Sequence, residues 1–361
     1  MNKVVLMWKR LAVGFLFGAI SVVVGLLVAE GVLRLSGAVP RETVFTVDAA
    51  EFDAVPGIFS PNQKGVQEKN ARLFGSVTIN NLGYRGTDIP LAKPANEFRI
   101  FMTGDSFTFG DYVHDDQTLP AQLEKELKKS CGAVRVINGG LGGSTISDQI
   151  ELSRRALVLN SDLVVVVFSE NDFSDLGKGK DMWRRLAENR QRKSRFPFSI
   201  VYRTLRKSAI WTLTLRVHQK MHRRVVWEQP TSGIDHNDPM KSSKTGLRDV
   251  YRNLLAQEKA ILAEAGIPLF FAAYPGWATV YGDHAPEEVT SAVAIASALG
   301  VPAMDLTTTI RTSGLSVNSA FLLPDDGHPS ANGYQVAATR LAEKMMMLGE
   351  LATRCESREV R

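Results

Sequence analysis

An unbroken run of apolar residues, LVVVVF at positions 163–168, constrains the fold more than any other stretch of this sequence. A strand with one face in water alternates apolar and polar side chains, whereas a strand buried on both faces shows no such alternation. The run therefore predicts a central strand with helices packed on both of its faces.

The flanking sequence supplies the strands and helices that such a strand needs. Four further segments are short, apolar and strand-like: residues 99–104, 134–138, 267–274 and 301–306. Five segments have helical spacing of apolar residues: 118–130, 148–159, 247–265, 286–299 and 331–347. Strands that alternate with helices predict an α/β fold with a parallel sheet.

The N-terminal region contains 19 uncharged residues, 11–29, close to the length that a helix needs to cross a bilayer. Lys3, Lys9 and Arg10 precede it, which predicts a cytoplasmic N-terminus and a periplasmic or extracellular remainder of the chain. A cleaved signal peptide is the alternative, but its apolar region is normally about 7–15 residues and ends at a small-residue site. We therefore favour an uncleaved, single-pass anchor in the cell (inner) membrane.

The net charge of +5 comes from one basic block, residues 178–224, with 15 Lys and Arg against Asp181 and Glu188. Nucleic acid is not expected outside the cytoplasm. Three roles stay open for the block: contact with anionic lipid, a cap that attracts an acidic glycan, or a solvated insertion. His218 and His222, four residues apart within it, are interpreted as part of a basic face and not as metal ligands.

These features divide the chain into four parts. They are an N-terminus and anchor at 1–35, an irregular lead-in at 36–96, a main domain at 97–350 with a basic insertion at 177–230, and a tail at 351–361. Cys131 and Cys355 either pair or stay free.

Polar stretches follow the predicted strands or precede the last helix, where the functional residues of an open parallel sheet gather. Acyl transfer requires a nucleophile, a base and a group that orients the base. Ser106 is the candidate nucleophile, His328 the base and Asp325 the orienting acid, with Asp326 as the rival of Asp325.

An oxyanion hole is expected from three donors. They are the backbone N–H of Ser106, an N–H of the glycine-rich loop after residue 138, and the side-chain amide of Asn171. Asp105 and Asp172 are interpreted as residues that brace turns, not as a glycosidase-type carboxylate pair.

Four motifs in this order resemble the SGNH/GDSL hydrolase superfamily: GDSFTFG at 104–110, NGGLGG at 138–143, SEND at 169–172 and DDGH at 325–328. The resemblance implies a three-layer α/β/α sandwich with a flavodoxin-like sheet, and ester hydrolysis through an acyl-serine without metal or cofactor. It assigns Gly143 to the oxyanion hole and favours Asp325 as orienter. Ser169 departs from the family, which commonly has glycine there. Residues 81–86 resemble a segment of membrane-anchored bacterial members.

The sequence thus predicts a membrane-anchored serine esterase. Its expected substrate is an O-acyl, above all O-acetyl, ester of a cell-surface carbohydrate or lipid. Two alternatives stay open. One is an O-acyltransferase that modifies a surface polysaccharide, and the other is a non-catalytic carbohydrate-binding module in which Ser169 distorts the oxyanion hole.

Overall fold

The computed structural model describes residues 2–39, 45, 55–69, 72–179 and 244–359, with short stretches (184–186 and 208–214) and single positions between 182 and 217. The chain forms two compact units: residues 1–44 with 193–230, and residues 45–192 with 231–361. Most of the basic block, including both of its histidines, lies outside the described residues, so its proposed roles remain predictions.

The first unit contains one long helix, α1 (Asn2–Leu35). Among the described residues, α1 is the one helix long and apolar enough to span a bilayer, and its apolar stretch has a mean hydropathy of 2.7. Length and composition make α1 compatible with a membrane anchor or with a signal sequence.

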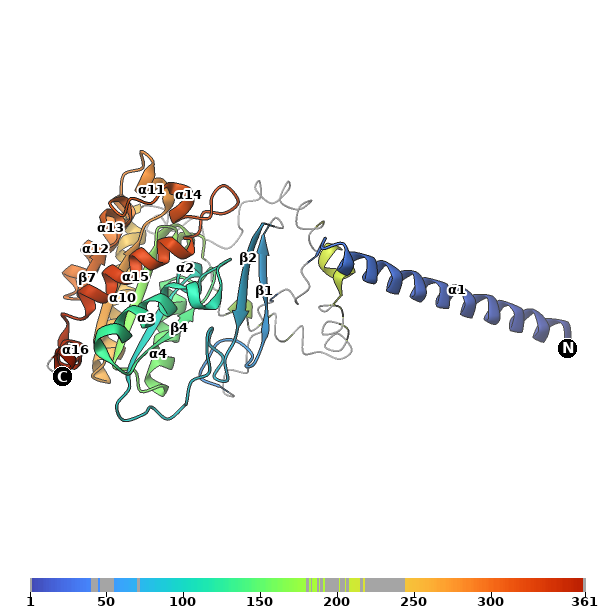
Figure 1. Ribbon diagram of the computed structural model, residues 1–361, viewed down its shortest axis with the longest axis horizontal. Coiled ribbons are helices and arrows are strands. Elements are labelled where there is room, and N and C mark those ends of the chain that lie inside the picture. The colour runs from blue at the N-terminus through green and yellow to red at the C-terminus, as the bar shows by residue number, and fades with distance from the viewer. Residues whose placement is uncertain are drawn as a thin grey trace. The chain divides into compact units, whose positions relative to one another are not determined.

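Five parallel strands form the central sheet of the second unit (Figure 1). Their spatial order is β4-β3-β5-β6-β7. Their bounds are β3 (Phe98–Gly104), β4 (Val134–Gly140), β5 (Leu163–Ser169), β6 (Leu269–Tyr274) and β7 (Ala303–Asp305). Numbered along the chain, the order is 2-1-3-4-5, that of flavodoxin-like sheets. The predicted α/β fold is confirmed. The strand order reverses between β3 and β5, where such sheets bind their ligands.

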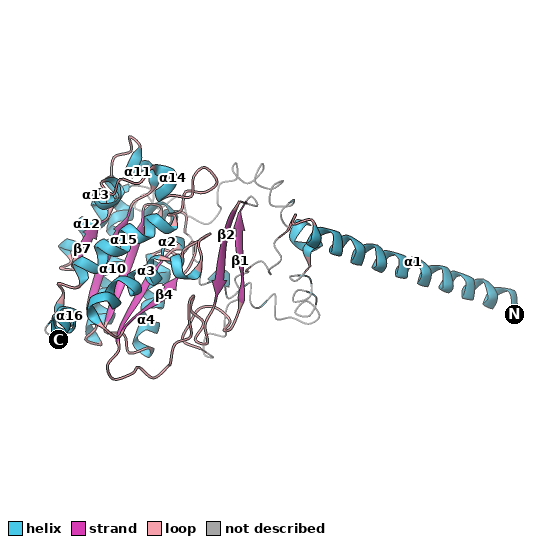
Figure 2. Cartoon of the chain, in the orientation of Figure 1, coloured by secondary structure: helices cyan, strands magenta, loops and turns pink. Residues whose placement is uncertain are grey.

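Helices cover both faces of the sheet, as Figure 2 shows. The helices of the second unit whose whole range the structure describes are α2 (Ser106–Phe109), the 3₁₀ turn η1 (Asp115–Gln117), α3 (Leu119–Cys131), α4 (Ile146–Val158), α5 (Asp172–Gly177), α10 (Lys244–Glu264), α11 (Trp277–Tyr281), α12 (Glu287–Ala298), α13 (Thr307–Arg311), α14 (Val317–Ala320), α15 (Ala331–Met345) and α16 (Gly349–Glu359). All five helices expected from apolar spacing are present among them.

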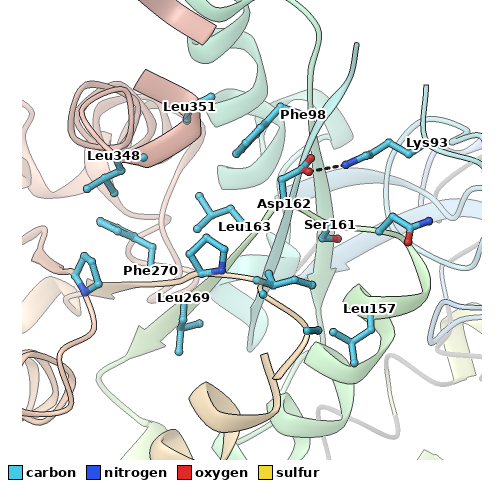
Figure 3. A pocket seen from close by; sticks show the side chains of 17 residues that line it. Lys93, Phe98, Leu157, Ser161, Asp162, Leu163, Leu269, Phe270, Leu348 and Leu351 are labelled. Carbon is cyan, nitrogen blue, oxygen red and sulfur yellow. Dashed lines mark hydrogen bonds and ion pairs between the residues drawn. The ribbon is translucent and has the colours of Figure 1, made fainter. Parts of the chain in front are cut away.

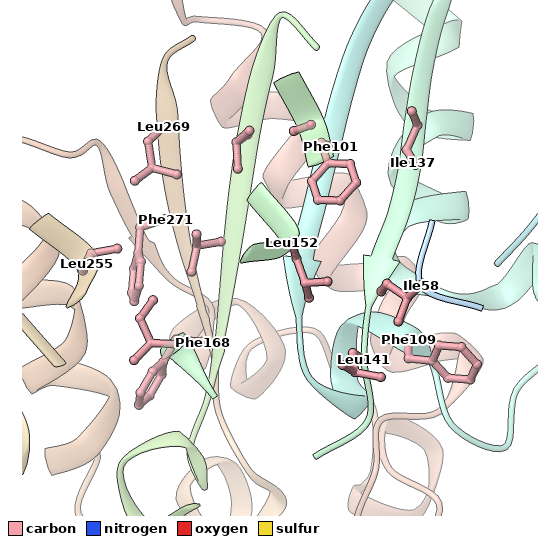
Figure 4. Close-up of a cluster of buried hydrophobic side chains, with 14 of the residues drawn as sticks. Ile58, Phe101, Phe109, Ile137, Leu141, Leu152, Phe168, Leu255, Leu269 and Phe271 are labelled. Carbon is pink, nitrogen blue, oxygen red and sulfur yellow. The ribbon is translucent and has the colours of Figure 1, made fainter. Parts of the chain in front are cut away.

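Strand β5 shows why the sheet needs helices on both faces, because all of its residues are buried. Val164, Val166 and Phe168 belong to the core cluster formed with α4, α10 and α12 (Figure 4). Val165 and Val167 belong to the opposite cluster, with α3, α13 and α15. Successive side chains of a strand point to opposite faces, so a continuous apolar run fills both cores. Each such burial contributes about 1.5–3 kcal/mol.

The lead-in before the sheet contains a hairpin. Strand β1 (Lys64–Lys69) pairs antiparallel with β2 (Leu73–Thr78). Nearby, Ile58, Phe59 and Tyr84 are buried in the core cluster of α4 and α10. The described part of residues 55–96 is therefore packed onto the sheet domain.

The C-terminal residues also belong to this unit. The segment from residue 351, expected as a tail, begins within α16, and Leu351 is buried there. A disulfide joins Cys355 of α16 to Cys131 at the end of α3. The pairing that the sequence left open is made.

A cavity of about 630 Å³ opens at the amino-terminal ends of the strands (Figure 3). Phe98, Leu163 and Leu269, the first residues of β3, β5 and β6, contribute to its wall, beside the Lys93–Asp162 ion pair. The polar loops predicted as a site follow the carboxyl ends of the strands, so this cavity is separate from them.

Candidate active site

The turn after β3 presents the Ser106 hydroxyl. Close packing requires glycine just before it, because a Cβ on Gly104 would lie 2.2 Å from Thr108 Oγ1. Asp105 then caps helix α2, since its Oδ1 accepts the N–H of Phe107 at 2.8 Å. Ser106 is thereby the first residue of α2, directly beyond the carboxyl end of β3.

His328 lies against Ser106, although 222 positions separate them in the chain. Its Nε2 is 2.7 Å from Ser106 Oγ, a hydrogen-bond distance. The imidazole lies beside two aromatic rings, with centroid distances of 5.3 Å to Phe107 and 6.0 Å to Tyr112. The structure thus brings the predicted nucleophile and base together.

The carboxylate at the imidazole belongs to Asp326, which corrects the prediction that Asp325 orients His328. Asp326 Oδ1 is hydrogen-bonded to Nδ1 of His328 and also accepts the backbone N–H of His328 at 2.8 Å. This return of an Asp side chain to the backbone two residues on is a common turn, and it carries the carboxylate to the ring. Asp325 instead lies 3.5 Å from the guanidinium of Arg72. Motif spacing does not reveal which of two adjacent carboxylates a turn directs inward.

Charges around the ring shift two pKa values. Burial lowers the pKa of His328, but the hydrogen bond to Asp326 and the charge of Asp111 outweigh it and raise the pKa above its ordinary value. Asp111 Oδ2 lies 3.9 Å from His328 Nε2. Burial opposes ionisation of Asp326 too, yet hydrogen bonds with His328 and Lys69 hold its pKa well below the usual range. Ionised Asp326 accepts a hydrogen bond from Nδ1–H, so the proton of the neutral ring stays on Nδ1. Nε2 is then free of a proton and can accept a hydrogen bond from the Ser106 hydroxyl.

Two backbone N–H groups expected to face an oxyanion lie on neighbouring loops. One is that of Ser106, and the other is that of Gly143, whose φ of +78° is a left-handed conformation that favours glycine. Within the described part of the chain, neither N–H has a hydrogen-bond acceptor. A Cβ on Gly142 would lie 3.9 Å from the Ser106 Cβ, so the glycine-rich loop borders the hydroxyl.

The Asn171 side chain reaches the same region, but carboxylates engage its amide. Nδ2 donates to Asp105 Oδ2 at 3.2 Å and to Asp175 Oδ2 at 3.0 Å. An amide nitrogen has two protons, so both are used in this arrangement. In the role expected from the sequence, Asn171 would have to release one carboxylate before it could donate to a substrate oxygen.

The sequence profile of the GDSL-like Lipase/Acylhydrolase family matches residues 102–336, which include Ser106 and His328. The chain belongs to the GDSL-like lipase/acylhydrolase family. It is therefore an ester-hydrolysing serine hydrolase, a GDSL hydrolase. The comparison with curated proteins finds no match.

Three solved structures are similar to the GDSL hydrolase at low sequence identity. The lipase/acylhydrolase from Enterococcus faecalis is 15% identical, with a TM-score of 0.40 over 69% of this chain and 95% of that one. A member of the lipolytic protein G-D-S-L family from Veillonella parvula DSM 2008 is 14% identical, with a TM-score of 0.41 over 70% and 100%. Axe2, an acetylxylan esterase from Geobacillus stearothermophilus, is 14% identical, with a TM-score of 0.38 over 69% and 93%.

Ser169, the departure from the family motif, joins three buried or half-buried side chains of the GDSL hydrolase. Its Oγ lies 2.7 Å from Asp105 Oδ2 and 2.9 Å from both Asn171 Oδ1 and Asp172 Oδ1. The hydroxyl has one proton and Asn171 Oδ1 has none, so all three contacts are hydrogen bonds only if the carboxyl groups of Asp105 and Asp172 supply the other two protons. Burial, and next the charge of Asp105, raise the pKa of Asp172 well above its ordinary value.

Among the described residues, no group of three or more His, Cys, Asp or Glu side chains is arranged to hold a metal ion.

Sequence reasoning missed three side chains at this site. Lys69 and Gln67 come from β1, and Asp111 follows α2. None of them belongs to a family motif, and the strand that carries two of them is too polar to stand out. The segment KGVQEK has three consecutive polar residues and no alternation, so it carried no strand signal.

Proposed function

We propose that the GDSL hydrolase is a membrane-anchored serine esterase that removes O-acyl groups, above all O-acetyl, from a carbohydrate or lipid of the cell surface. One observation carries the proposal: the 2.7 Å contact between Ser106 Oγ and His328 Nε2. With Asp326 on the other ring nitrogen, this contact supplies the nucleophile, the base and the orienting acid of acyl transfer.

In the proposed acylation, Ser106 Oγ attacks the ester carbonyl while His328 Nε2 takes its proton. Asp326 stabilises the imidazolium that results. The N–H groups of Ser106 and Gly143 hold the oxyanion, and the Asn171 amide joins them once it leaves one carboxylate. Each such donor lowers the barrier by about 2.7–4 kcal/mol. When the intermediate collapses, its C–O bond breaks, His328 gives its proton to the leaving alcohol, and the acyl group stays on Ser106.

Water completes the proposed cycle. His328 takes a proton from the water molecule while the water oxygen attacks the acyl-serine carbonyl. The carboxylic acid leaves and the proton returns to Ser106 Oγ. If a sugar hydroxyl replaces the water, the same acyl-enzyme makes the protein an O-acyltransferase.

Three features support a location on the outer side of the cytoplasmic membrane. Helix α1 is long enough to span a bilayer, and basic residues precede its apolar stretch. The disulfide between Cys131 and Cys355 is typical of oxidising compartments. The cations of residues 178–224 would attract acidic glycans or anionic lipids. A substrate of the cell envelope fits all three.

The test uses the full-length chain in detergent with p-nitrophenyl esters of increasing acyl length and with an acetylated polysaccharide. We expect hydrolysis of acetyl esters and covalent labelling by a fluorophosphonate, both lost in Ser106→Ala. Ser174→Ala, which removes an exposed hydroxyl of α5, is the matched control and should keep both. Labelling with turnover only after a sugar acceptor is added would favour the acyltransferase. Absence of both labelling and turnover would contradict the proposal and favour the binding module.

A further inference from the structure

One face of strand β1 delivers two side chains to the site. Residues two apart along a strand point to the same side, and Gln67 and Lys69 are such a pair. Lys69 Nζ donates to Asp326 Oδ2, the oxygen that does not face the imidazole. Gln67 Nε2 donates to Asp111 Oδ1 at 2.7 Å. The strand therefore contacts the carboxylates on both sides of His328.

The ion pair between Lys69 and Asp326 is largely shielded from water, with side chains 19% and 5% exposed. Salt screens a shielded pair less than an exposed one, and loss of one partner leaves the other charge uncompensated. Lys69 Nζ also lies 5.6 Å from the centre of the Tyr112 ring, which neighbours His328. The ammonium group is thus held between a carboxylate and an aromatic ring of the site.

We propose that Lys69 is a positioning residue of the GDSL hydrolase: its ion pair fixes the Asp326 carboxylate so that Oδ1 faces His328. The terminal torsion of an Asp side chain is soft, so a partner on the second oxygen restricts its rotation. The same hairpin region contributes Arg72, which pairs with Asp325. The hairpin thereby holds the two adjacent carboxylates apart in separate ion pairs. This inference rests on the proposed esterase reaction.

Removal of the ammonium charge has a predictable sign. Several charged or titratable groups face the imidazole or its immediate partners, and they come from the loops after β3 and α2, the turn before His328 and strand β1: Asp105, Asp111, Tyr112, Asp326 and Lys69. Without Lys69 the surroundings of the ring are more negative, so the pKa of His328 rises further. The neutral base then requires a higher pH, and the acid limb of the kcat/KM profile moves upward.

The test compares Lys69→Met, Lys69→Arg and Lys64→Met in the full-length chain, with p-nitrophenyl acetate as substrate. Lys64 is exposed on the opposite face of the same strand, so its variant removes an equal charge away from the site. For Lys69→Met we expect kcat to fall about 10- to 100-fold, KM to change less than about twofold, and the acid limb to move upward. Lys69→Arg should restore most of kcat, and Lys64→Met should match the wild type.

A folded Lys69→Met variant with unchanged kcat and an unchanged acid limb would overturn the inference. If that variant does not fold, Lys69→Gln keeps a hydrogen-bond donor without the charge, and an unmoved acid limb there overturns the inference equally. Failure of the proposed function is distinct, because the wild type itself would then neither hydrolyse the ester nor react with a fluorophosphonate. In that event the inference about Lys69 is overturned as well, because it rests on that reaction.

Discussion

At the scale of single residues, the two nitrogens of the His328 ring face different carboxylates. Asp326 contacts Nδ1, whereas Asp111 Oδ2 lies 3.9 Å from Nε2, the atom that takes the Ser106 proton in the proposed reaction. Burial lowers the pKa of His328, but the two charges together raise it above its ordinary value. A general base must be neutral, so we expect hydrolysis to fall as the pH drops through this raised pKa.

Asp111→Asn should move that fall to lower pH. The substitution removes a negative charge that stabilises the imidazolium, so the pKa of His328 falls. The neutral imidazole, which acts as the base, then forms at a lower pH. The measurement is the acid limb of kcat/KM with p-nitrophenyl acetate. Asp116→Asn, in the exposed 3₁₀ turn η1, removes the same charge five positions along and should leave the limb in place. An upward shift in Asp111→Asn would contradict this account of the ring.

Ser169→Ala should destabilise the GDSL hydrolase by about 1–3 kcal/mol. The variant keeps the Cβ but removes a hydroxyl that contacts Asp105, Asn171 and Asp172, and it leaves buried carboxyl oxygens with fewer partners. Chemical denaturation measures the change. Ser174→Ala, an exposed hydroxyl nearby, should change the free energy of unfolding by less than about 0.5 kcal/mol. Equal effects in the two variants would show that the hydroxyl of Ser169 contributes little.

The sequence predicted part of the arrangement of these site residues. The meeting of Ser106 and His328 was expected because the Ser106 motif follows a strand and the His328 motif precedes the last helix, and both positions fall at the carboxyl edge of a parallel sheet. The choice of Asp326 does not follow, because it depends on the local turn and on ion pairs with Lys69 and Arg72. Those partners are more than 200 positions away and belong to no motif.

At the scale of elements, Arg85 ties the β1–β2 hairpin to the loop that follows α2. Its side chain is 1% exposed, pairs with Asp115 at 2.9 Å and lies 4.8 Å from the centre of the Phe109 ring. Its guanidinium also donates to four backbone carbonyls, those of Ser76, Phe109, Gly110 and Val113. The loop held in this way carries Asp111, so the arginine supports the geometry around His328.

Arg85→Met should lower the free energy of unfolding by about 3–5 kcal/mol, since it leaves a carboxylate and several carbonyls without their partner. Urea denaturation of the purified chain is the measurement. Arg340→Met, in which an exposed arginine of α15 loses its pairing with Glu343, should cost less than about 1 kcal/mol. A loss in Arg85→Met no larger than in this control would show that the hairpin and loop are held by other contacts.

Elements with strong apolar periodicity were predictable, and β1 was not. Strand β5 is apolar at every position except its last, Ser169, and α3 repeats leucine every four residues, so the pattern of each predicted one type of element. In β1 the single buried side chain is Val66, and the rest are polar or half-buried. Its order comes from pairing with β2 and from contacts with Asp111 and Asp326, which only the folded chain supplies.

At the scale of the whole molecule, the disulfide between Cys131 and Cys355 closes the sheet domain by joining helices α3 and α16, 224 positions apart. Reduction should lower the free energy of unfolding by about 2–4 kcal/mol, because the unfolded chain regains freedom. Denaturation with and without reductant measures this. The double variant Cys131→Ser, Cys355→Ser should have the same free energy of unfolding as the reduced wild type, and reductant should not change it. Equal stability of the oxidised and reduced wild type would contradict the prediction.

The first unit offers an argument for retention of α1. Glu30, near the end of this helix, accepts hydrogen bonds from Ser208 Oγ at 2.8 Å and from the N–H groups of Ala209 and Ile210 at 2.7 and 3.1 Å. A carboxylate that receives the first N–H groups of a helix caps it, and residues 209–214 are helical. Removal of α1 would take this cap away, so the contact favours an anchor over a cleaved signal sequence.

We therefore expect the mature chain to keep α1. A chain with different epitope tags at its two ends should give one membrane-bound band that carries both tags and resists a carbonate wash. Leu27→Ala is the matched control, because it creates Ala-Val-Ala at 27–29, a site of the kind that signal peptidases cleave. That variant should lose the N-terminal tag and enter the soluble fraction. A wild-type chain that loses the tag in the same way would show that α1 is a signal sequence, and the enzyme would then reach its substrate without a tether.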